Sequence, residues 1–150
     1  MNVIEFIVGR RPIIPDTIST PPDDVIWRSI RPKPGEPVRA WRAESTCTVE
    51  TGQGKLKARG GKDFIIEYAP ADRAVIRGDI FERTYERVDE GEYVKRTDIT
   101  LRYFTLDRPV IVATLEGKQR AAPGDWIVEG TADELWPVPQ AKTASKYDPA

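Results

Sequence analysis

Two stretches of this 150-residue chain resemble each other, and this internal similarity constrains the fold more than any other feature of the sequence. Residues 48–67 align with residues 111–129 when one extra residue, Lys62, is allowed in the first copy. The identical positions are Val49, Thr51, Gly54, Lys55, Ala58, Gly61, Asp63, Ile65 and Glu67, which match Val112, Thr114, Gly117, Lys118, Ala121, Gly124, Asp125, Ile127 and Glu129. Two unrelated hairpins would share some of these residues, because turns select glycine and aspartate. The copies also share an apolar alternation, so we expect a duplicated unit.

Each copy is predicted to form short strands followed by a short helix. In the second copy the β-branched run 109–114 predicts a strand, and Pro123-Gly124-Asp125 predicts a tight turn before the next strand at 126–129. Apolar residues at helical spacing between Gly78 and Val88 predict an amphipathic helix at the end of the first copy. A weaker pattern over 139–147 predicts its counterpart in the second copy.

The predicted fold class is therefore β-rich α+β, with two tandem, small antiparallel β-sheet units that each end in a short helix. The expected boundaries place an N-terminal strand and a Pro-rich arm in residues 1–43, the first unit in 44–88, and a linker with the second unit in 89–150. Seven prolines in the arm exclude a regular helix through it. Since a unit of about 60 residues buries only about 60% of its surface alone, we expect the two units to pack together as one compact domain.

Missing residue types narrow the chemistry and the cellular setting. The chain has no histidine, which excludes Ser-His-Asp and Cys-His catalysis and histidine metal sites. Its one cysteine cannot form an internal disulfide, and no run approaches the ~18 apolar residues of a membrane helix. Arg10 and Arg11 follow the first apolar run, the reverse of the order in a signal peptide. We therefore expect a cytoplasmic protein with no membrane association and no cofactor.

The distribution of charge argues against nucleic-acid binding. Residues 1–43 carry seven basic and five acidic side chains, residues 44–88 carry eight of each, and residues 89–150 carry eight basic and eleven acidic. Nucleic-acid-binding proteins usually present a basic patch, because the release of phosphate counterions supplies much of their affinity. In this chain acidic residues dilute the basic ones in every segment, and a protein partner, from a host or from the protein itself, is the better expectation.

The segments after the repeated hairpin resemble the PGDYG domain family of small bacterial and phage proteins. The resemblance rests on Tyr68-Ala69-Pro70-Ala71-Asp72-Arg73-Ala74-Val75-Ile76, followed by Gly78-Asp79-Ile80-Phe81-Glu82-Arg83-Thr84-Tyr85-Glu86, which is similar to the family's "IFxxTYE" helix. The stretch 114–138, with its PGDWI turn, looks like a second, divergent copy. Only Pro70 and Asp72 of the first turn remain, since Ala71, Arg73 and Ala74 replace its other residues. The resemblance implies a β-rich fold and a bacterial or phage setting, and it implies no reaction.

Five residues are the sequence candidates for a binding or interface site: Asp63, Asp125, Arg73, Trp126 and Trp136. The duplicated Asp63 and Asp125, with Glu67 and Glu129, are carboxylates that would suit a divalent cation or acid–base chemistry. The alternative is that each aspartate accepts hydrogen bonds from its own turn. The two tryptophans are suited to a ligand surface or an interface, and core packing is the alternative, especially for Trp126.

Two other features have ordinary structural explanations. Cys47 lies between two threonines, and we expect it to be a small packed side chain, because a nucleophilic thiolate needs a base or a cationic setting. The basic run 55–62 is suited to phosphate contacts, but a solvated edge strand whose lysines discourage pairing explains it as well.

Three functional classes remain open from the sequence. The first is a non-enzymatic protein-interaction module, which the missing catalytic residues and the paired surfaces of a duplicated scaffold favour. The second is a small-molecule or nucleotide binder at the cleft between the repeats, which an apolar pocket with converging arginines would support. The third is a carboxylate-based hydrolase or transferase, which requires acidic residues of both units to converge.

Overall fold

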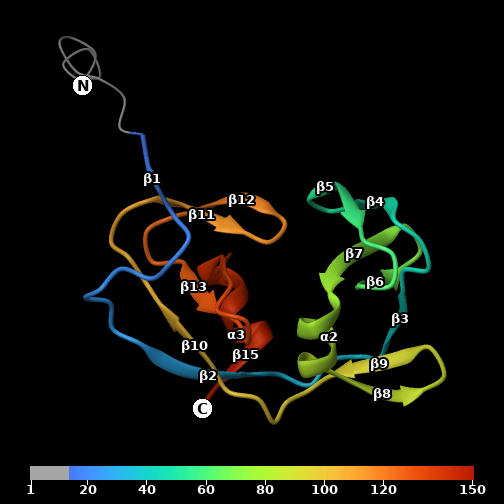
Figure 1. Cartoon of the computed structure of the whole chain (residues 1–150). Helices are drawn as coiled ribbons and strands as arrows, with labels where there is room; N and C mark the ends of the chain where they lie inside the picture. The colour runs from blue at the N-terminus through green and yellow to red at the C-terminus, as the bar shows by residue number, and fades with distance from the viewer. Residues whose placement is uncertain (1–13) are drawn as a thin grey trace.

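The computed structural model describes residues 14–150, and these form two β-rich lobes that lie side by side (Figure 1). Each lobe contains a five-stranded sheet and a separate hairpin, and short helices complete both lobes. The prediction of a β-rich fold with short helices is confirmed. Residues 1–13, which belong to the segment of the expected N-terminal strand and arm, lie outside the described residues. Within residues 14–150, no helix is both long enough and apolar enough to span a bilayer.

The first lobe is built around a sheet with the strand order β7-β6-β3-β9-β8. Its strands are β3 (Val38–Arg42), β6 (Asp63–Ala69), β7 (Asp72–Arg77), β8 (Tyr85–Asp89) and β9 (Glu92–Lys95). The hairpin of β4 (Cys47–Thr51) and β5 (Gly54–Ala58) forms a two-stranded sheet, and helix α2 (Gly78–Thr84) follows β7 directly.

The second lobe has a five-stranded sheet with the order β14-β13-β10-β2-β15. Its strands are β2 (Arg28–Pro32), β10 (Leu101–Phe104), β13 (Trp126–Glu129), β14 (Leu135–Val138) and β15 (Tyr147–Pro149). The hairpin of β11 (Val110–Thr114) and β12 (Gly117–Ala121) is extended by β1 (Asp16–Ile18), which pairs with β11 in the parallel direction. A 3₁₀ turn, η1 (Gln140–Lys142), and helix α3 (Thr143–Lys146) lead into β15.

The two five-stranded sheets have the same strand order and the same register at positions 62 or 63 residues apart. Arg39 pairs with Glu67 in one sheet, and Arg102 pairs with Glu129 in the other. The pair Phe64–Ile76 corresponds to Trp126–Val138, and the pair Tyr85–Lys95 corresponds to Tyr147–Pro32. The turn glycines also correspond, since the Gly61 amide donates to Ala43 and the Gly124 amide donates to Leu106, with φ of 73° and 84°.

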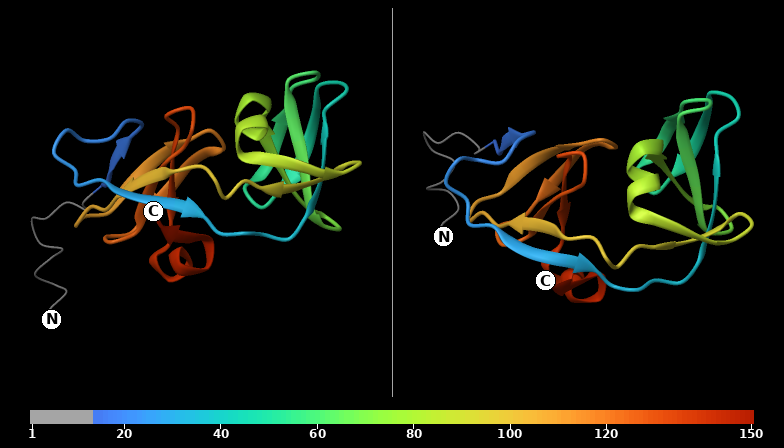
Figure 2. Two further views of the ribbon diagram at one scale, coloured as in Figure 1. Left: turned by 90° about the horizontal axis from the view of Figure 1, so that it is seen from below. Right: turned by 60° about the horizontal axis from the view of Figure 1, so that its bottom comes forward.

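The connections between the lobes exchange one strand in each direction. Strand β2 directly precedes β3 in the chain but lies in the other lobe, and β9 directly precedes β10 but also lies in the other lobe. The connecting segments 33–37 and 96–100 pass side by side between the lobes (Figure 2). The sheets therefore draw strands from both sides of the boundaries expected at 43/44 and 88/89. The described part of segment 1–43 also contains three strands, where one strand and an irregular arm were expected.

The predicted helix 78–88 is correct only in its first half. Helix α2 buries Ile80 and Phe81, as the spacing indicated, but it ends at Thr84. Residues 85–89 continue as β8 because they pair with β9, and Val88 is exposed. Tertiary pairing thus overrides a helical pattern at this point.

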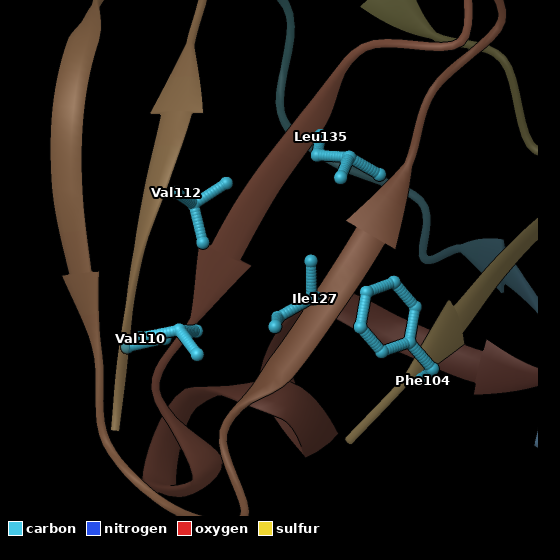
Figure 3. Packing of buried hydrophobic residues seen from close by; sticks show 6 residues of the cluster. Phe104, Val110, Val112, Ile127 and Leu135 are labelled. Carbon is cyan, nitrogen blue, oxygen red and sulfur yellow. The ribbon is translucent and has the colours of Figure 1, made fainter. Parts of the chain in front are cut away.

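Each lobe has its own apolar core. In the second lobe Phe104, Val110, Val112, Ile127 and Leu135 are buried together between the five-stranded sheet and the hairpin (Figure 3). In the first lobe the rings of Phe64, Phe81 and Tyr85 form a continuous stack, with centroid separations of 4.1 and 4.8 Å. Because the two cores are separate, neither core fills the space between the lobes, and side chains of both lobes line that space.

Candidate functional site: the cleft between the lobes

A cleft of about 780 Å³ lies between the two lobes and is lined by residues from both. Figure 1 shows the hairpins β4–β5 and β11–β12 facing each other at one end of this gap, with β9 and β15 toward the other end. The volume lies within the ~300–1,000 Å³ range of ligand pockets. This is the candidate functional site.

Corresponding residues of the two lobes line the cleft. Its lining includes five pairs of residues that stand 62 or 63 positions apart in the sequence. These pairs are Pro32 with Lys95, Tyr68 with Gly130, Ala74 with Trp136, Thr84 with Lys146, and Tyr85 with Tyr147. Both halves of the chain therefore build the same site.

Each lobe presents one aromatic pair to the cleft. In the first lobe the buried Tyr85 lies beside Tyr68, and burial raises the pKa of Tyr85 far above its usual value. In the second lobe Tyr147 lies beside Trp136, and burial again raises the tyrosine pKa. Both phenols therefore stay neutral and act as apolar walls with one polar edge.

The aromatic partners of the two tyrosines stand at different positions. Tyr68 corresponds to Gly130 in the other lobe, and Trp136 corresponds to Ala74. At each of these two positions one lobe has a large ring and the other has a small residue. At Gly130 the space of the missing side chain is taken by the Glu134 carboxylate.

Charged residues line the cleft with an excess of basic side chains. The lining contains Lys57, Arg59, Arg77, Lys95 and Lys146 as cations and Asp63, Glu116 and Glu134 as anions. Arg59 and Arg77 are occupied by ion pairs with Asp63 and Asp79. Partial burial raises the pKa of Glu116, which lies at the tip of the β11–β12 hairpin.

The structure assigns structural roles to both candidate aspartates. Asp63 is buried and accepts hydrogen bonds from the Arg59 backbone amide at 2.8 Å and from the Arg59 guanidinium at 2.9 and 3.0 Å. Asp125 accepts from the Ala122 amide at 2.9 Å and from the Gln140 amide at 3.1 Å. Each carboxylate thus closes its own turn, which is the alternative that the sequence left open.

The two candidate tryptophans occupy different environments. Trp126 stacks on Tyr103 with a centroid separation of 3.8 Å and an interplanar angle of 9°, on the sheet of the second lobe. Trp136 is half-buried on β14 and lines the cleft. The structure therefore places Trp136, and not Trp126, at the candidate site.

Arg73 lies outside the cleft lining and is occupied by neighbours on its own sheet. Its guanidinium binds Glu67 across β6 and β7 at 2.8 Å and lies 5.5 Å from the centroid of the Trp41 ring. The corresponding carboxylate, Glu129, binds Arg102 at 2.7 Å. Both glutamates therefore take part in cross-strand ion pairs.

The expectation for Cys47 is wrong. Its side chain is exposed at the start of β4, where the structure describes no partner for the thiol. Strand β4 pairs only with β5 among residues 14–150, so no other strand covers its outer edge.

Sequence reasoning missed the residues that dominate the cleft: Tyr68, Tyr85, Lys95, Lys146 and Tyr147. A signal for two of them was present, because Tyr85 and Tyr147 stand at the same offset as the duplicated Asp63 and Asp125. No such signal marks the lysines, which are brought together only by the exchange of strands.

No group of three or more potential metal-ligating side chains occurs within residues 14–150. Comparison of the chain with protein-family models, curated proteins and solved structures found no significant match. The resemblance to the PGDYG family therefore stays an expectation.

Proposed function

We propose that this chain is an internally duplicated binding protein whose small-molecule ligand occupies the cleft between the two lobes. The observation that carries this proposal is the lining of the cleft by corresponding residues of both halves, with an aromatic pair from each lobe. A concave, mainly apolar site with a few polar groups is the usual form of a small-molecule site. The cytoplasmic, bacterial or phage setting expected from the sequence belongs to the same proposal.

The geometry is better suited to binding than to carboxylate chemistry. The duplicated Asp63 and Asp125 lie in different lobes, and each is engaged by amides of its own turn. Acid–base catalysis by this pair would need both carboxylates within reach of one substrate. Binding of a ligand in the cleft requires no rearrangement of the side chains that line it.

A protein-interaction module is the second candidate, and one observation favours it. The edge of β11 is covered by β1, which pairs through Asp16–Val110, Thr17–Ile111 and Ile18–Val112. The corresponding strand β4 has no strand on that edge within residues 14–150. An open strand edge is a template for an added strand of a partner.

One experiment separates the two candidates. The full-length chain is isolated from a lysate of the source organism, and the bound material is analysed both for proteins and for low-mass compounds by mass spectrometry. Ala74→Trp is the matched variant, because it adds at Ala74 the ring that Trp136 has at the corresponding position and so fills the cleft.

We expect a low-mass compound that is retained by the wild-type chain and lost from Ala74→Trp, while both proteins melt at similar temperatures without ligand. The recovered compound should raise the melting temperature of the wild-type chain only. A stoichiometric protein that is recovered equally with both chains would contradict the small-molecule proposal and favour the interaction module.

A further inference from the structure

Two lysines enter the cleft from opposite lobes. Lys95 is the last residue of β9 and pairs with Tyr85, and Lys146 immediately precedes Tyr147 at the end of α3. Both line the cleft, and neither forms an ion pair within the described residues 14–150. The strand exchange is what brings them together, since Lys95 precedes β10 in the chain but lies in the first lobe.

The two lysines line the same cleft. Although the Lys95 side chain is exposed, desolvation by the surrounding residues lowers its pKa below the usual value, and the positive charge of Lys146 lowers it further. Two like charges that face one space without counterions of their own form an attractive site for an anion, which would relieve their repulsion.

The aromatic side chains lie beside these two lysines. Tyr85 is the register partner of Lys95, and Tyr147 follows Lys146 directly in the chain. The neighbours of these tyrosines, Tyr68 and Trp136, also line the cleft. An anionic group held by the lysines would therefore leave the rest of the ligand against flat apolar walls.

The acidic residues of the cleft lie on other elements. Glu116 stands in the turn of the β11–β12 hairpin, and Glu134 lies in the loop before β14. Figure 1 shows this hairpin toward the opposite end of the gap from β9 and β15. Lys57, on the β4–β5 hairpin at that same end, is a further cation of the lining.

We infer that the cleft recognises an aromatic organic anion, whose phosphate or carboxylate binds between Lys95 and Lys146 and whose ring packs against the tyrosine and tryptophan walls. This inference rests on the proposed function, because it specifies the ligand class of the same cleft. An ammonium group acts as a point charge with three donors, so a pair of lysines suits phosphate and carboxylate alike.

The test measures binding of four probes to the full-length chain by isothermal titration calorimetry. The probes are phenyl phosphate and benzoate, which combine a ring with an anion, phenol, which has the ring alone, and inorganic phosphate, which has the anion alone. The variants are Lys95→Met and Lys146→Met, which keep most of the length of the side chain and remove its charge. Lys118→Met is the control, because Lys118 is exposed on β12 and does not line the cleft.

We expect the wild-type chain to bind phenyl phosphate or benzoate at least tenfold more tightly than phenol or inorganic phosphate. Each lysine variant should weaken this binding about tenfold, and Lys118→Met should leave it unchanged. Affinity should also fall as salt is added, since the interaction is between charges. The stronger of the two aromatic anions would identify phosphate or carboxylate as the preferred group.

Two results would overturn the inference, and they differ in what they mean for the proposed function. Binding of phenol that equals binding of both aromatic anions, with no effect of the lysine variants, would leave a cleft that binds neutral rings. Failure of all four probes to bind the wild-type chain at millimolar concentration would remove the aromatic anion as the ligand class. The isolation experiment with Ala74→Trp tests the cleft separately, because it assumes no ligand class.

Discussion

At the scale of single residues, Asp63 and Asp125 show how similar turns are held in two ways. Both carboxylates accept a hydrogen bond from a backbone amide three or four residues earlier in the chain. Asp63 has in addition the guanidinium of Arg59, whose place is taken by Ala122 in the other lobe. Asp125 instead accepts a hydrogen bond from the amide that begins η1.

The difference predicts unequal costs for the same substitution. Asp63→Asn should lower the free energy of unfolding by about 1–3 kcal/mol, because it removes charge-assisted hydrogen bonds from a buried carboxylate. Asp125→Asn should cost less, because Asp125 has no cationic partner like Arg59 and the asparagine oxygen keeps one of its two backbone hydrogen bonds. Urea unfolding at neutral pH measures both variants, and a larger loss for Asp125→Asn would contradict this reading of the turns.

The same ion pair predicts a dependence on pH. The hydrogen bond from Arg59 is the largest cause that lowers the pKa of Asp63 below its ordinary value of 3.8. The carboxylate therefore stabilises the fold fully above that value, and the contribution is lost as the pH falls through the lower pKa of the folded state. The wild-type chain should lose more stability than Asp63→Asn between about pH 5 and pH 2. Parallel curves for the two proteins would argue against a charged Asp63.

At the scale of elements, the extra residue Lys62 explains why α2 begins with glycine. Gly78 is buried at the junction of β7 and α2, and a Cβ at this position would overlap the carbonyl oxygen of Lys62. In the other lobe the matching turn lacks the extra residue, and the corresponding position is Gln140. The insertion and the glycine thus belong together.

Gly78→Ala should lower the free energy of unfolding by about 1–3 kcal/mol, because the backbone around Lys62 must shift to admit a methyl group. Gly52→Ala is the control, since a Cβ there has no atom within 4 Å, and it should change stability by less than about 0.5 kcal/mol. Thermal unfolding of the two variants measures both effects. Equal melting temperatures would show that the junction relaxes without cost.

At the scale of the whole molecule, the two lobes are held together by exchanged strands. Strand β9 pairs with β3 and β8 of the first lobe, and β2 pairs with β10 and β15 of the second. The first sheet is complete within residues 38–95, whereas the second combines β2, which precedes that stretch, with β10, β13, β14 and β15, which follow it. The cleft depends on this arrangement, because its lysines and aromatic pairs are in place only when β9 lies in the first sheet and β2 lies in the second.

Cleavage of the full-length chain in the turn between β8 and β9 tests this arrangement. With a protease site inserted between Glu90 and Gly91, the cut protein should stay associated and elute like the uncut protein on size exclusion, because each fragment supplies a strand to the other sheet. Separated fragments should lose the cooperative thermal transition. Two fragments that separate without denaturant and remain folded would contradict the exchange.

The local features of the fold follow from local sequence patterns. β-branched runs, turn residues at Gly61 and Gly124, and an apolar alternation were sufficient to predict the strands of both hairpins, the turn roles of Asp63 and Asp125, and the start of α2. These features depend on residues within about ten positions of each other, where backbone preference and side-chain spacing dominate.

The tertiary structure alone decided which strand joins which sheet. A five-residue connection such as 33–37 or 96–100 permits a strand either to fold back on its own unit or to cross to the other one, and no residue pattern distinguishes the two paths. The pairing of β9 with β8 also made residues 85–89 a strand where a helix was predicted. The same pairing placed Lys95 in the cleft that Lys146 lines. Long-range pairing is set by the sum of contacts over the whole chain, so the candidate site became visible only when both lobes were in place.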